Sequence, residues 1–472
     1  MKKTKIVATI GPATETEEVL SQMIAAGMNV ARFNAKHSTP KWHAERIERV
    51  KKLAKKTKIT IGVLLDLQGP EIRIDLPSEK SFKMKRGDLI TFTSDRESKP
   101  KRNTAFIPQL VIDSIPEKNE ILLDDGACEF TIVEKGSDYF KAESMSDCEV
   151  SHRKTMNTPG IVLDMPSLTP RDYQFLDGVD AKFIDFVGLS FVRDKSDIKI
   201  LRNELDKRKM EKASIIAKIE NQAALDNIDE IIETADGIMI ARGDLGIEVH
   251  YKKTTFWQKQ IIKKCRTASK PVITATQMLK SMVSHSRATR AEVSDVTNAI
   301  FDGTDALMLS EETTIGEFPV QAVTVQATIA EYNEEYAQVS ICQEMEKDSD
   351  FTASITRSAI ELLNHATLNI DQIVCLTTTG KTARLLSRFR PNQIISAVST
   401  IEKTSDQLSL SYGIESHYVD DLNEKKQKNM RELVNILKKK QIVQKGETIL
   451  LLHGKYLIVD GMSNTLSIVE VK

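Results

Sequence analysis

The chain has 472 residues, which is too long for one ordinary hydrophobic core, so we expect two or three domains, one of them large enough to be a barrel. Its 66 basic and 67 acidic residues nearly cancel, so no global field favours nucleic acid or a membrane surface as a partner, and any anion site must be local. Five scattered cysteines without paired or metal-type spacing predict free thiols in a reducing compartment, most simply the cytoplasm.

The start of the chain, MKKTKIVATIGP, is basic, but its apolar stretch is too short for a signal peptide. No later apolar run reaches membrane-spanning length. We therefore expect a soluble protein without a membrane partner.

Short apolar or β-branched runs alternate with amphipathic stretches along most of the chain. Their continuous apolarity is typical of strands buried on both faces, and the helical stretches between them indicate parallel βα units. Eight such runs predict a closed (β/α)8 barrel of the TIM type. In chain order they are KIVATI (5–10), MNVARF (28–33), TIGVLLDL (60–67), FIDFVGLSFV (183–192), SIIAKIE (214–220), GIMIARG (237–243), PVITATQM (271–278) and DALMLS (305–310).

Two regions depart from this rhythm. The interval from about 74 to 151 contains short strand patterns between Gly, Asp and Asn turns and no convincing helix, which predicts an inserted all-β domain. After about residue 340 the alternation restarts with QIVCLTTTG, QIISAVS, GIESHYV and GETILLLHG, which predicts a separate α/β domain. CQEMEKDSDF (342–351) is the expected linker, and residues 423–441 form an expected surface helix. The predicted domains are therefore 1–73 with 152–340, 74–151, and 341–472.

Polar side chains follow the predicted barrel strands, whose carboxyl ends share one mouth. Lys218 and Glu220 are two residues apart on one strand, so both leave the same face, and Asp244 follows the next strand. Two carboxylates beside a lysine suit a Mg²⁺ ion that keeps waters and accepts substrate oxygens, with the lysine neutralising a transferring anion. The alternative is an ordinary buried ion pair, and three such groups at aligned strand ends favour the metal–phosphate interpretation.

Two further features lie at the same mouth. The segment RGDLG around Asp244 has glycines on both sides, so its backbone N–H groups can bind a carboxylate or phosphate, although Gly-Asp also marks plain turns. Thr276 and Ser310 end the last two predicted strands with hydroxyls. For either residue, a hydroxyl that only hydrogen-bonds to the backbone is an equally good interpretation.

With these residues in place, the chain resembles the pyruvate kinase family over nearly its whole length. The matching segments are TKIVATIGPAT, AGMNVARFN, GPEIR, IIAKIEN, DGIMIARGDLG, ITATQML, RATRAEVSDVTNAIFDGTDALMLS and TTTGKTARLLSRFRP. The resemblance implies a barrel interrupted by a mobile β lid, a C-terminal α/β domain and usually a homotetramer. It also implies the glycolytic transfer of a phosphoryl group from phosphoenolpyruvate to ADP, giving pyruvate and ATP, with Mg²⁺ as cofactor.

The resemblance also assigns roles to individual residues. Lys218 matches the lysine that stabilises the phosphoryl group, Arg32 matches the arginine that holds the phosphate, and Glu220 and Asp244 match the Mg²⁺ ligands. Gly243 matches the carboxylate-binding turn. The remaining assignments are Thr276, Ser310 and Glu312 for protonation of the enolate, and Arg73, His37, Asn34 and Arg171 for the nucleotide side.

One departure from the family pattern concerns potassium. Where the family resembles RLNFSHG and LDTKGPEIR, this chain has RFNAKHST and LDLQGPEIR, so Lys36 stands at a ligand position of the monovalent cation. Asn34, Asp66 and the carbonyl of Leu67 remain available at that site. We hypothesise that the Lys36 ammonium occupies the cation position, hydrogen-bonded to Asn34 and paired with Asp66, which leaves the need for K⁺ open. The alternatives are a lysine swung into solvent and, because of Glu71, retained potassium dependence.

Other departures concern the substrates and an effector. Glu311 replaces a glycine and is expected to point outward, while Gln68, Arg171 and Val293 also differ from the family pattern. A similar loop binds a sugar-phosphate activator in some family members. The corresponding residues here are Thr377, Thr378, Thr379, Gly380, Lys381 and Thr382. An ordinary capped turn is an equally good interpretation of this loop.

Two rival functions remain at this stage. The same mouth can support enolate chemistry on a related oxoacid, as in metal-dependent aldolases. The clustered departures also suit a paralogue that binds a ligand and regulates a partner protein without turnover. The joint presence of Lys218, Glu220, Asp244 and Thr276 favours catalysis.

Overall fold

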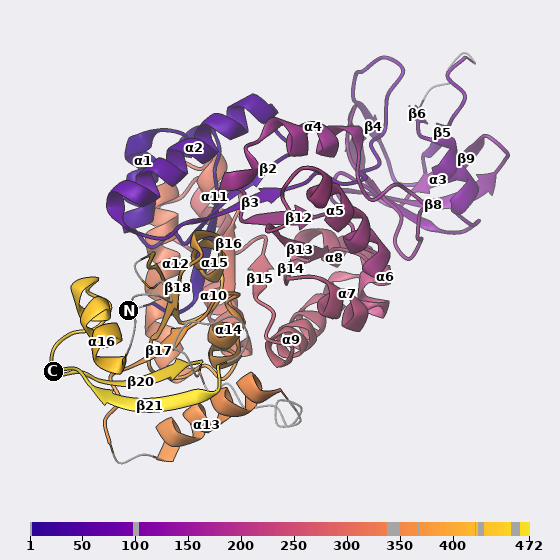
Figure 1. Ribbon diagram of the computed structural model, residues 1–472. Helices are drawn as coiled ribbons and strands as arrows, with labels where there is room; N and C mark the ends of the chain where they lie inside the picture. The colour runs from indigo at the N-terminus through magenta and orange to yellow at the C-terminus, as the bar shows by residue number, and fades with distance from the viewer. Residues whose placement is uncertain are drawn as a thin grey trace.

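The structure is a computed structural model that describes residues 2–97, 103–337, 350–365, 368–420, 422, 429–454 and 463–472. Figure 1 shows a central barrel, a β domain that projects beyond it, and a C-terminal domain at the other end of the molecule. Within the described ranges, none of the helices combines the length and apolar character needed to cross a lipid bilayer. Cys128, Cys148, Cys265 and Cys375 are free thiols, and Cys342 lies outside the described residues.

The predicted eight-stranded parallel barrel is confirmed. Its strands close in the order β1-β16-β15-β14-β13-β12-β3-β2. Their bounds are β1 (Lys5–Thr9), β2 (Val30–Asn34), β3 (Gly62–Asp66), β12 (Phe186–Leu189), β13 (Ser214–Ile219), β14 (Gly237–Ala241), β15 (Val272–Ala275) and β16 (Ala306–Leu309). Because every connection runs in parallel, all carboxyl ends of these strands open at the same mouth.

Helices cover the outside of the barrel. They are α1 (Glu17–Ala25), α2 (Pro40–Thr57), α4 (Pro170–Gly178), α5 (Lys195–Lys207), α6 (Gln222–Asp226), α7 (Ile228–Thr234), α8 (Arg242–Glu248), α9 (Tyr251–Thr267), α10 (Arg290–Asp302), α11 (Glu311–Thr314) and α12 (Pro319–Asn333), with short 3-10 turns at Pro12–Thr14, Ala181–Phe183, Lys280–Val283 and Glu334–Tyr336. The strands are apolar on both faces because one face packs against these helices and the other fills the barrel interior.

The inserted domain is a six-stranded sheet in the order β11-β7-β8-β9-β5-β6, with a separate β4–β10 pair. The strands are β4 (Phe82–Met84), β5 (Leu89–Thr93), β6 (Thr104–Phe106), β7 (Glu120–Leu123), β8 (Cys128–Lys135), β9 (Tyr139–Ser144), β10 (Cys148–Val150) and β11 (Met156–Asn157). The expectation of no helix here is wrong, because α3 (Gln109–Ser114) buries Val111 and Ile112 against the domain core. Six residues are too few to produce a visible helical period.

The C-terminal domain is a five-stranded sheet in the order β19-β18-β17-β20-β21, as Figure 1 shows near the chain end. Its elements are α13 (Phe351–His365), β17 (Gln372–Leu376), α14 (Lys381–Ser387), β18 (Ile395–Ser399), α15 (Glu402–Leu408), β19 (Ile414–Tyr418), α16 (Met430–Lys439), β20 (Thr448–His453) and β21 (Thr465–Glu470). The antiparallel edge strand β21 was not expected, because it is half-exposed and lacks a continuous apolar run. Most of the expected linker and the first part of the 423–441 segment lie outside the described residues.

The C-terminal domain closes the end of the barrel opposite the mouth. Leu410 is fully buried in the cluster that fills the barrel interior, beside residues such as Val7 and Phe186. The Tyr412 backbone N–H donates to Asp305 at 3.0 Å, and Lys5 Nζ donates to the Ile414 carbonyl at 2.7 Å. These contacts fix the C-terminal domain to the amino ends of the strands.

A charge network reinforces this junction. Lys51 pairs with Asp185 at 2.6 Å and with Asp406 at 2.7 Å, and Lys403 pairs with Asp185 at 2.9 Å. Asp185 is fully buried. Burial and the neighbouring Asp185 carboxylate raise the pKa of Asp406 to about 6, although Lys51 acts in the opposite direction.

This pKa predicts how the junction responds to pH. A carboxyl whose pKa rises on folding binds its proton more tightly in the folded state, so its contribution to stability is fully present below about pH 4 and is lost as the pH rises to about 6. We expect Asp406→Asn to flatten this part of the stability profile, measured as the midpoint of thermal unfolding between pH 4 and 7. If the unfolding midpoints of the variant and the parent changed equally with pH, the raised pKa of Asp406 would be contradicted.

Candidate active site

A buried carboxylate at the end of β3 organises the barrel mouth. Asp66 accepts hydrogen bonds from Arg32 Nε, and its Oδ2 lies 2.7 Å from Arg32 NH2, while Oδ1 lies 3.5 Å from Lys218 Nζ. Burial alone would raise the pKa of Asp66, but Lys218 and Arg32 outweigh it and lower the pKa. Asp66 therefore stays ionised and holds the two cations in place.

Lys218 is buried between three polar side chains. Its Nζ lies 3.0 Å from Glu220 Oε1 and donates to Ser190 Oγ at 2.8 Å. Burial alone would lower the pKa of Lys218, but Asp66 and Glu220 raise it above its ordinary value. Ser190 was not singled out from the sequence, although it lies within the fourth predicted strand run and directly follows β12. Its hydroxyl donates to the Leu67 carbonyl at 2.7 Å.

Glu220 and Asp244 are the two acidic groups expected to hold a metal. Glu220 Oε2 accepts the Phe191 N–H at 2.7 Å, whereas its Oε1 faces the Lys218 ammonium at 3.0 Å. Burial raises the pKa of Glu220, Lys218 opposes this rise and Asp244 adds to it. No group of three or more acidic, His or Cys side chains with metal geometry occurs in the described part of the chain. Two neighbouring carboxylates nevertheless suit a cation that takes its other ligands from substrate and water.

The turn after β15 is held in an unusual backbone conformation. Thr276 and Gln277 have φ values of 70° and 55°, in the left-handed region, and the Gly243 N–H donates to Thr276 Oγ1 at 2.8 Å. Arg242 fastens this turn by donating to the Thr276 carbonyl at 2.8 Å and to Asp295 at 2.7 Å. The Thr276 hydroxyl thus accepts a backbone N–H, as the structural alternative expected, while its own hydrogen stays available for a further bond.

Lys36 lies at the mouth with a different partner from the one expected. The hypothesis that it pairs with Asp66 is wrong, because its ammonium forms an ion pair with Glu71, whose side chain is 6% exposed. The Asn34 side-chain oxygen accepts the Lys36 backbone N–H at 3.1 Å rather than the ammonium. The side chain is not swung into solvent, since it is only 20% exposed and its nitrogen lies 5.7 Å from the Phe191 ring centre.

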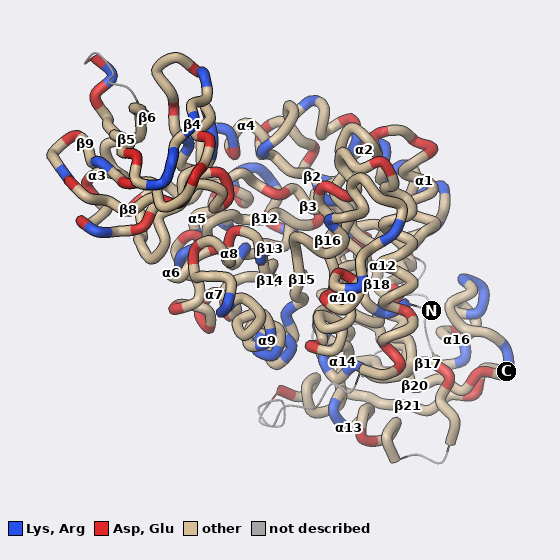
Figure 2. Tube along the Cα trace, turned by 180° about the vertical axis from the view of Figure 1, so that it is seen from behind, with Lys and Arg blue, Asp and Glu red and all other residues tan. Residues whose placement is uncertain are grey.

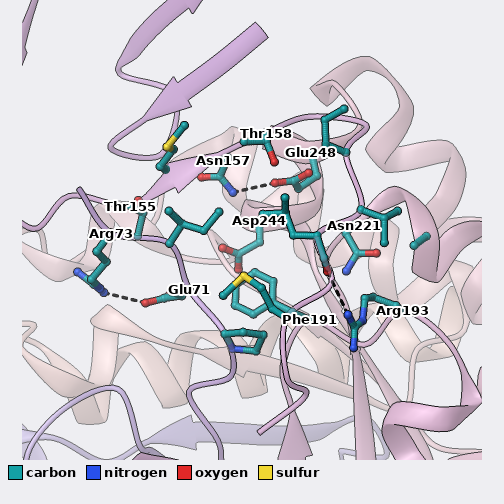
Figure 3. Close-up of a pocket in the computed structure, with 18 of the residues that line it drawn as sticks. Glu71, Arg73, Thr155, Asn157, Thr158, Phe191, Arg193, Asn221, Asp244 and Glu248 are labelled. Atoms are coloured by element: carbon teal, nitrogen blue, oxygen red, sulfur yellow. Dashed lines mark hydrogen bonds and ion pairs between the residues drawn. The ribbon is translucent and has the colours of Figure 1, made fainter. Parts of the chain in front are cut away.

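Glu71 joins Lys36 to a second cation. Arg73 donates to Glu71 Oε2 at 2.8 Å, as Figure 3 shows. Burial would raise the pKa of Glu71, but Lys36 and Arg73 lower it. Burial and then Lys36 lower the pKa of His37, which lines the same cavity and is therefore disposed to be neutral. Positive charge thus concentrates at the side of the mouth nearest the lid.

Glu312 and Ser310 lie at the end of β16. Glu312 is buried and accepts the Leu279 and Ser310 N–H groups at 3.1 and 2.7 Å, so it fixes the backbone around the last strand. Glu311 is half-exposed and pairs with Lys280 at the rim of the cavity. Its charge is thus compensated at the rim.

The mouth opens into a cavity of about 390 Å³ between barrel and lid. Figure 3 shows Thr155, Asn157 and Thr158 on the lid side facing Asp244 and Glu248 on the barrel side. Asn157 donates to Glu248 at 2.9 Å, and burial raises the pKa of Glu248. This contact between β11 and α8 was missed from the sequence, because neither residue belongs to a strand end that signals a site.

Two other groups of expected site residues have local partners. Arg171 donates to the backbone carbonyls of Ala35 and Ser38 at 2.7 and 2.8 Å, so it orders the loop after β2. In the loop before α14, Thr377 Oγ1 accepts the Gly380 N–H at 3.0 Å and Thr382 Oγ lies 2.7 Å from Ser463 Oγ. Nucleotide contact by Arg171 and effector binding by Thr377–Thr382 both stay predictions.

A closed barrel whose mouth gathers an arginine, a lysine and three acidic side chains beneath a β lid fits an enzyme of the phosphotransferase class. The chain belongs to the pyruvate kinase family. The family model for the pyruvate kinase barrel domain matches residues 1–323, and the model for its alpha/beta domain matches residues 353–469.

Individual relatives agree with this family. A pyruvate kinase of Staphylococcus epidermidis is 40% identical over 424 residues, which cover 88% of this chain and 71% of that protein. A pyruvate kinase of Staphylococcus aureus is 39% identical over 425 residues, with the same two coverages. The crystal structure of a pyruvate kinase from Cryptosporidium parvum superposes with a TM-score of 0.90 at 31% identity, covering 100% of this chain and 96% of that one.

The position of Asp66 depends on a glycine in the neighbouring strand. A Cβ atom on Gly188 would lie 2.7 Å from Asp66 Oδ1. We expect Gly188→Ala to displace the carboxylate and lower kcat by about a hundredfold, because small displacements of a positioned group are costly to catalysis. Gly237→Ala, where a Cβ would meet Ile216 at 2.8 Å at the other end of the barrel, is the matched control and should keep activity. Equal kcat in both variants would contradict this prediction.

Proposed function

We propose that this protein transfers the phosphoryl group of phosphoenolpyruvate to ADP, giving pyruvate and ATP, with Mg²⁺ as the divalent cofactor. The observation that carries the proposal is the clamped Lys218, held by Asp66, Glu220 and Ser190 at the mouth beside Arg32. Phosphoryl transfer needs positioned positive charge more than a covalent nucleophile. Family membership adds the substrate pair.

In this proposal the residues of the mouth divide the work. Lys218 and Arg32 neutralise the charge that spreads over the moving phosphoryl group, and their ion pairs to Asp66 keep both cations from following it. Glu220 and Asp244 would hold Mg²⁺, which supplies Lewis-acid stabilisation of phosphoryl and enolate oxygens when bound. The turn at Gly243 would bind the substrate carboxylate through its backbone N–H groups, with the Gly243 N–H exchanging its bond to Thr276 Oγ1 for the substrate.

Protonation of the enolate is assigned to the Thr276 hydroxyl. Its oxygen accepts the Gly243 N–H, so its own hydrogen points elsewhere and can be donated, directly or through water. Ser310 lies at the end of the neighbouring strand, and Glu312 fixes the Ser310 backbone. Arg73 and His37 lie toward the lid, where we place the nucleotide. A homotetramer and a sugar-phosphate effector are carried only by the family resemblance.

The activity is tested by coupling pyruvate formation to lactate dehydrogenase with phosphoenolpyruvate, ADP and Mg²⁺. We expect turnover that requires Mg²⁺, and a loss of kcat of about a thousandfold in Lys218→Met, because a charge that stabilises the transition state is removed. Lys199→Met, an exposed substitution on α5, is the control. Turnover of an oxoacid without ADP would support the aldolase alternative, and ligand binding without any turnover would support the regulatory one.

We further propose that Lys36 supplies the monovalent charge that K⁺ provides elsewhere in the family. Its ammonium is held by buried Glu71 on one side and lies by the Phe191 ring on the other. After burial, Lys218 and Arg32, Lys36 is a further influence on the pKa of Asp66, so its charge reaches the phosphate-binding cluster. A lysine fixed here delivers the unit charge of K⁺ without an exchangeable ion.

This second proposal predicts a gain of potassium dependence on mutation. The parent enzyme should keep its activity within about twofold when K⁺ and Na⁺ are replaced by tetramethylammonium, and Lys36→Ser should fall about a hundredfold and recover on addition of K⁺. Lys41→Ser on the exposed face of α2 is the matched control. If the parent enzyme needs added K⁺, this proposal for Lys36 is wrong. The phosphotransferase proposal would not be affected by that result.

A further inference from the structure

Two of the free thiols lie in the inserted β domain that forms the lid, on strands that contact each other. Cys128 begins β8 and Cys148 begins β10. Cys128 Sγ donates to the carbonyl of Glu149, the residue directly after Cys148, at 3.5 Å. Cys128 belongs to the core cluster of this domain, and Cys148 packs against the same cluster. The two side chains therefore approach one another from different strands.

A hydrogen-bonded turn after β9 brings Cys148 to this position. The Met145 N–H donates to the Glu129 carbonyl at 2.8 Å, so the chain leaves β9 beside the start of β8. Ser144 Oγ donates to the Ser146 carbonyl at 2.8 Å and lies 3.7 Å from Cys148 Sγ. The place of the Cys148 sulfur is thus set by this turn and not by a free loop.

The two thiols differ in exposure and in acidity. Cys128 is 1% exposed, whereas Cys148 is partly exposed. Burial, followed by the neighbouring Cys148 thiol, raises the pKa of Cys128 to about 12. Because the thiolate is the nucleophile, Cys148 is the thiol that an external reagent can reach and that can attack it. Cys128 lies behind Cys148 as the second thiol.

We propose that Cys148 and Cys128 form a modification site at which a neutral small-molecule disulfide is reduced and a disulfide bond is made within the lid. The Cys148 thiolate attacks one sulfur of the reagent, forms a mixed disulfide and releases one thiolate. The Cys128 thiol then loses its proton, attacks the Cys148 sulfur and releases the second thiolate. Two protein thiols are oxidised, one reagent disulfide is reduced, and the two released thiolates take up the two protons. A thiol reductant reverses both steps, as is typical of disulfides in reducing compartments.

The charges next to Cys148 select the class of reagent. Cys148 stands between Asp147 and Glu149, and both of these side chains are exposed. Farther from it, acidic and basic residues are intermixed over the lid, as Figure 2 shows. Two adjacent carboxylates repel an anionic disulfide, so a neutral disulfide reacts faster.

The bond connects two segments that form the lid side of the active-site cavity. Asp125, shortly before Cys128, and Thr155, which follows β10, both line this cavity. Thr155 Oγ1 donates to Asp125 Oδ1 at 3.4 Å, and Lys154 pairs with Asp124 at 2.9 Å. A covalent link beside these polar contacts limits how far the two segments separate. The resulting effect on nucleotide binding rests on the proposed phosphotransferase function, whereas the bond itself does not.

Peptide mapping of the full chain, without substrates, tests the bond. The native protein is incubated at about pH 8 with bis(2-hydroxyethyl) disulfide, blocked with N-ethylmaleimide and digested. We expect at least about half of the chains to yield a peptide pair that joins Cys128 to Cys148, and dithiothreitol to remove it. Oxidised glutathione, which is anionic, should react at least about threefold more slowly.

Three variants separate the two steps. Cys128→Ser should stop at the mixed disulfide on Cys148, and Cys148→Ser should form neither product. Cys342→Ser leaves both lid thiols in place, so it is the matched control and should give the same cross-link as the parent.

Hydrogen exchange gives a second measurement that needs no variant. The bond closes a loop of about 20 residues, which disfavours opening of β10 and of its partner strand β4. Amide exchange in both strands should slow at least about threefold on oxidation. In the turnover assay, oxidation should change the KM for ADP at least about twofold, and dithiothreitol should restore it.

The proposal is overturned if both lid thiols stay reduced in the parent chain, if the mixed disulfide on Cys148 never passes to Cys128, or if Cys148 joins another cysteine instead. Equal rates with the neutral and the anionic reagent would overturn the selection by charge. An unchanged KM for ADP in the cross-linked protein would overturn the effect on the active site. Absence of turnover in the untreated protein would count against the phosphotransferase proposal and not against the bond.

Discussion

The mouth of this barrel depends on one buried carboxylate. Asp66 has no exposed surface, yet it carries a charge because two cations, Arg32 and Lys218, approach it from neighbouring strands. The attraction is mutual, since Asp66 also raises the pKa of the buried Lys218 and holds the Arg32 guanidinium in place. Glu220 completes the set on the far side of Lys218. Cations that are buried and held in place are what the stabilisation of a moving phosphoryl group requires.

The two ends of the barrel are closed by different means. At the mouth, the lid domain contributes Asn157 to a hydrogen bond with Glu248, so the cavity over the charged cluster is bounded by protein on both sides. At the other end, Leu410 of the C-terminal domain enters the apolar interior, and Lys51 and Lys403 clamp the rim through Asp185. The strands are therefore held at both ends, and their register fixes the distances within the cluster.

The surroundings of Lys36 show how a buried carboxylate fixes a cation at the barrel mouth. In the proposal made above, the Lys36 ammonium takes the place of the monovalent cation, and Glu71 is its ion-pair partner. Arg73 binds the other oxygen of Glu71, so the carboxylate is shared by two cations. The sequence had pointed to Asp66 as the partner of Lys36, but Asp66 was already committed to Arg32 and Lys218, and a carboxylate surrounded by two closer cations gains less from a third.

The sequence by itself determined the barrel, the additional β domain and the C-terminal α/β domain, because the alternation of continuous apolar runs with amphipathic stretches follows from the local geometry of strands and helices. It also determined which side chains gather at the mouth, since every parallel strand ends there. Only the tertiary structure decided who pairs with whom: Lys36 with Glu71, Lys218 with Ser190, and Asn157 with Glu248. Such pairings depend on distances across strands, lid and loops that lie far apart in the chain. The short helix α3 and the half-exposed edge strand β21 were missed for another reason: their hydrophobic periodicity in the sequence is too weak to indicate a helix or a strand.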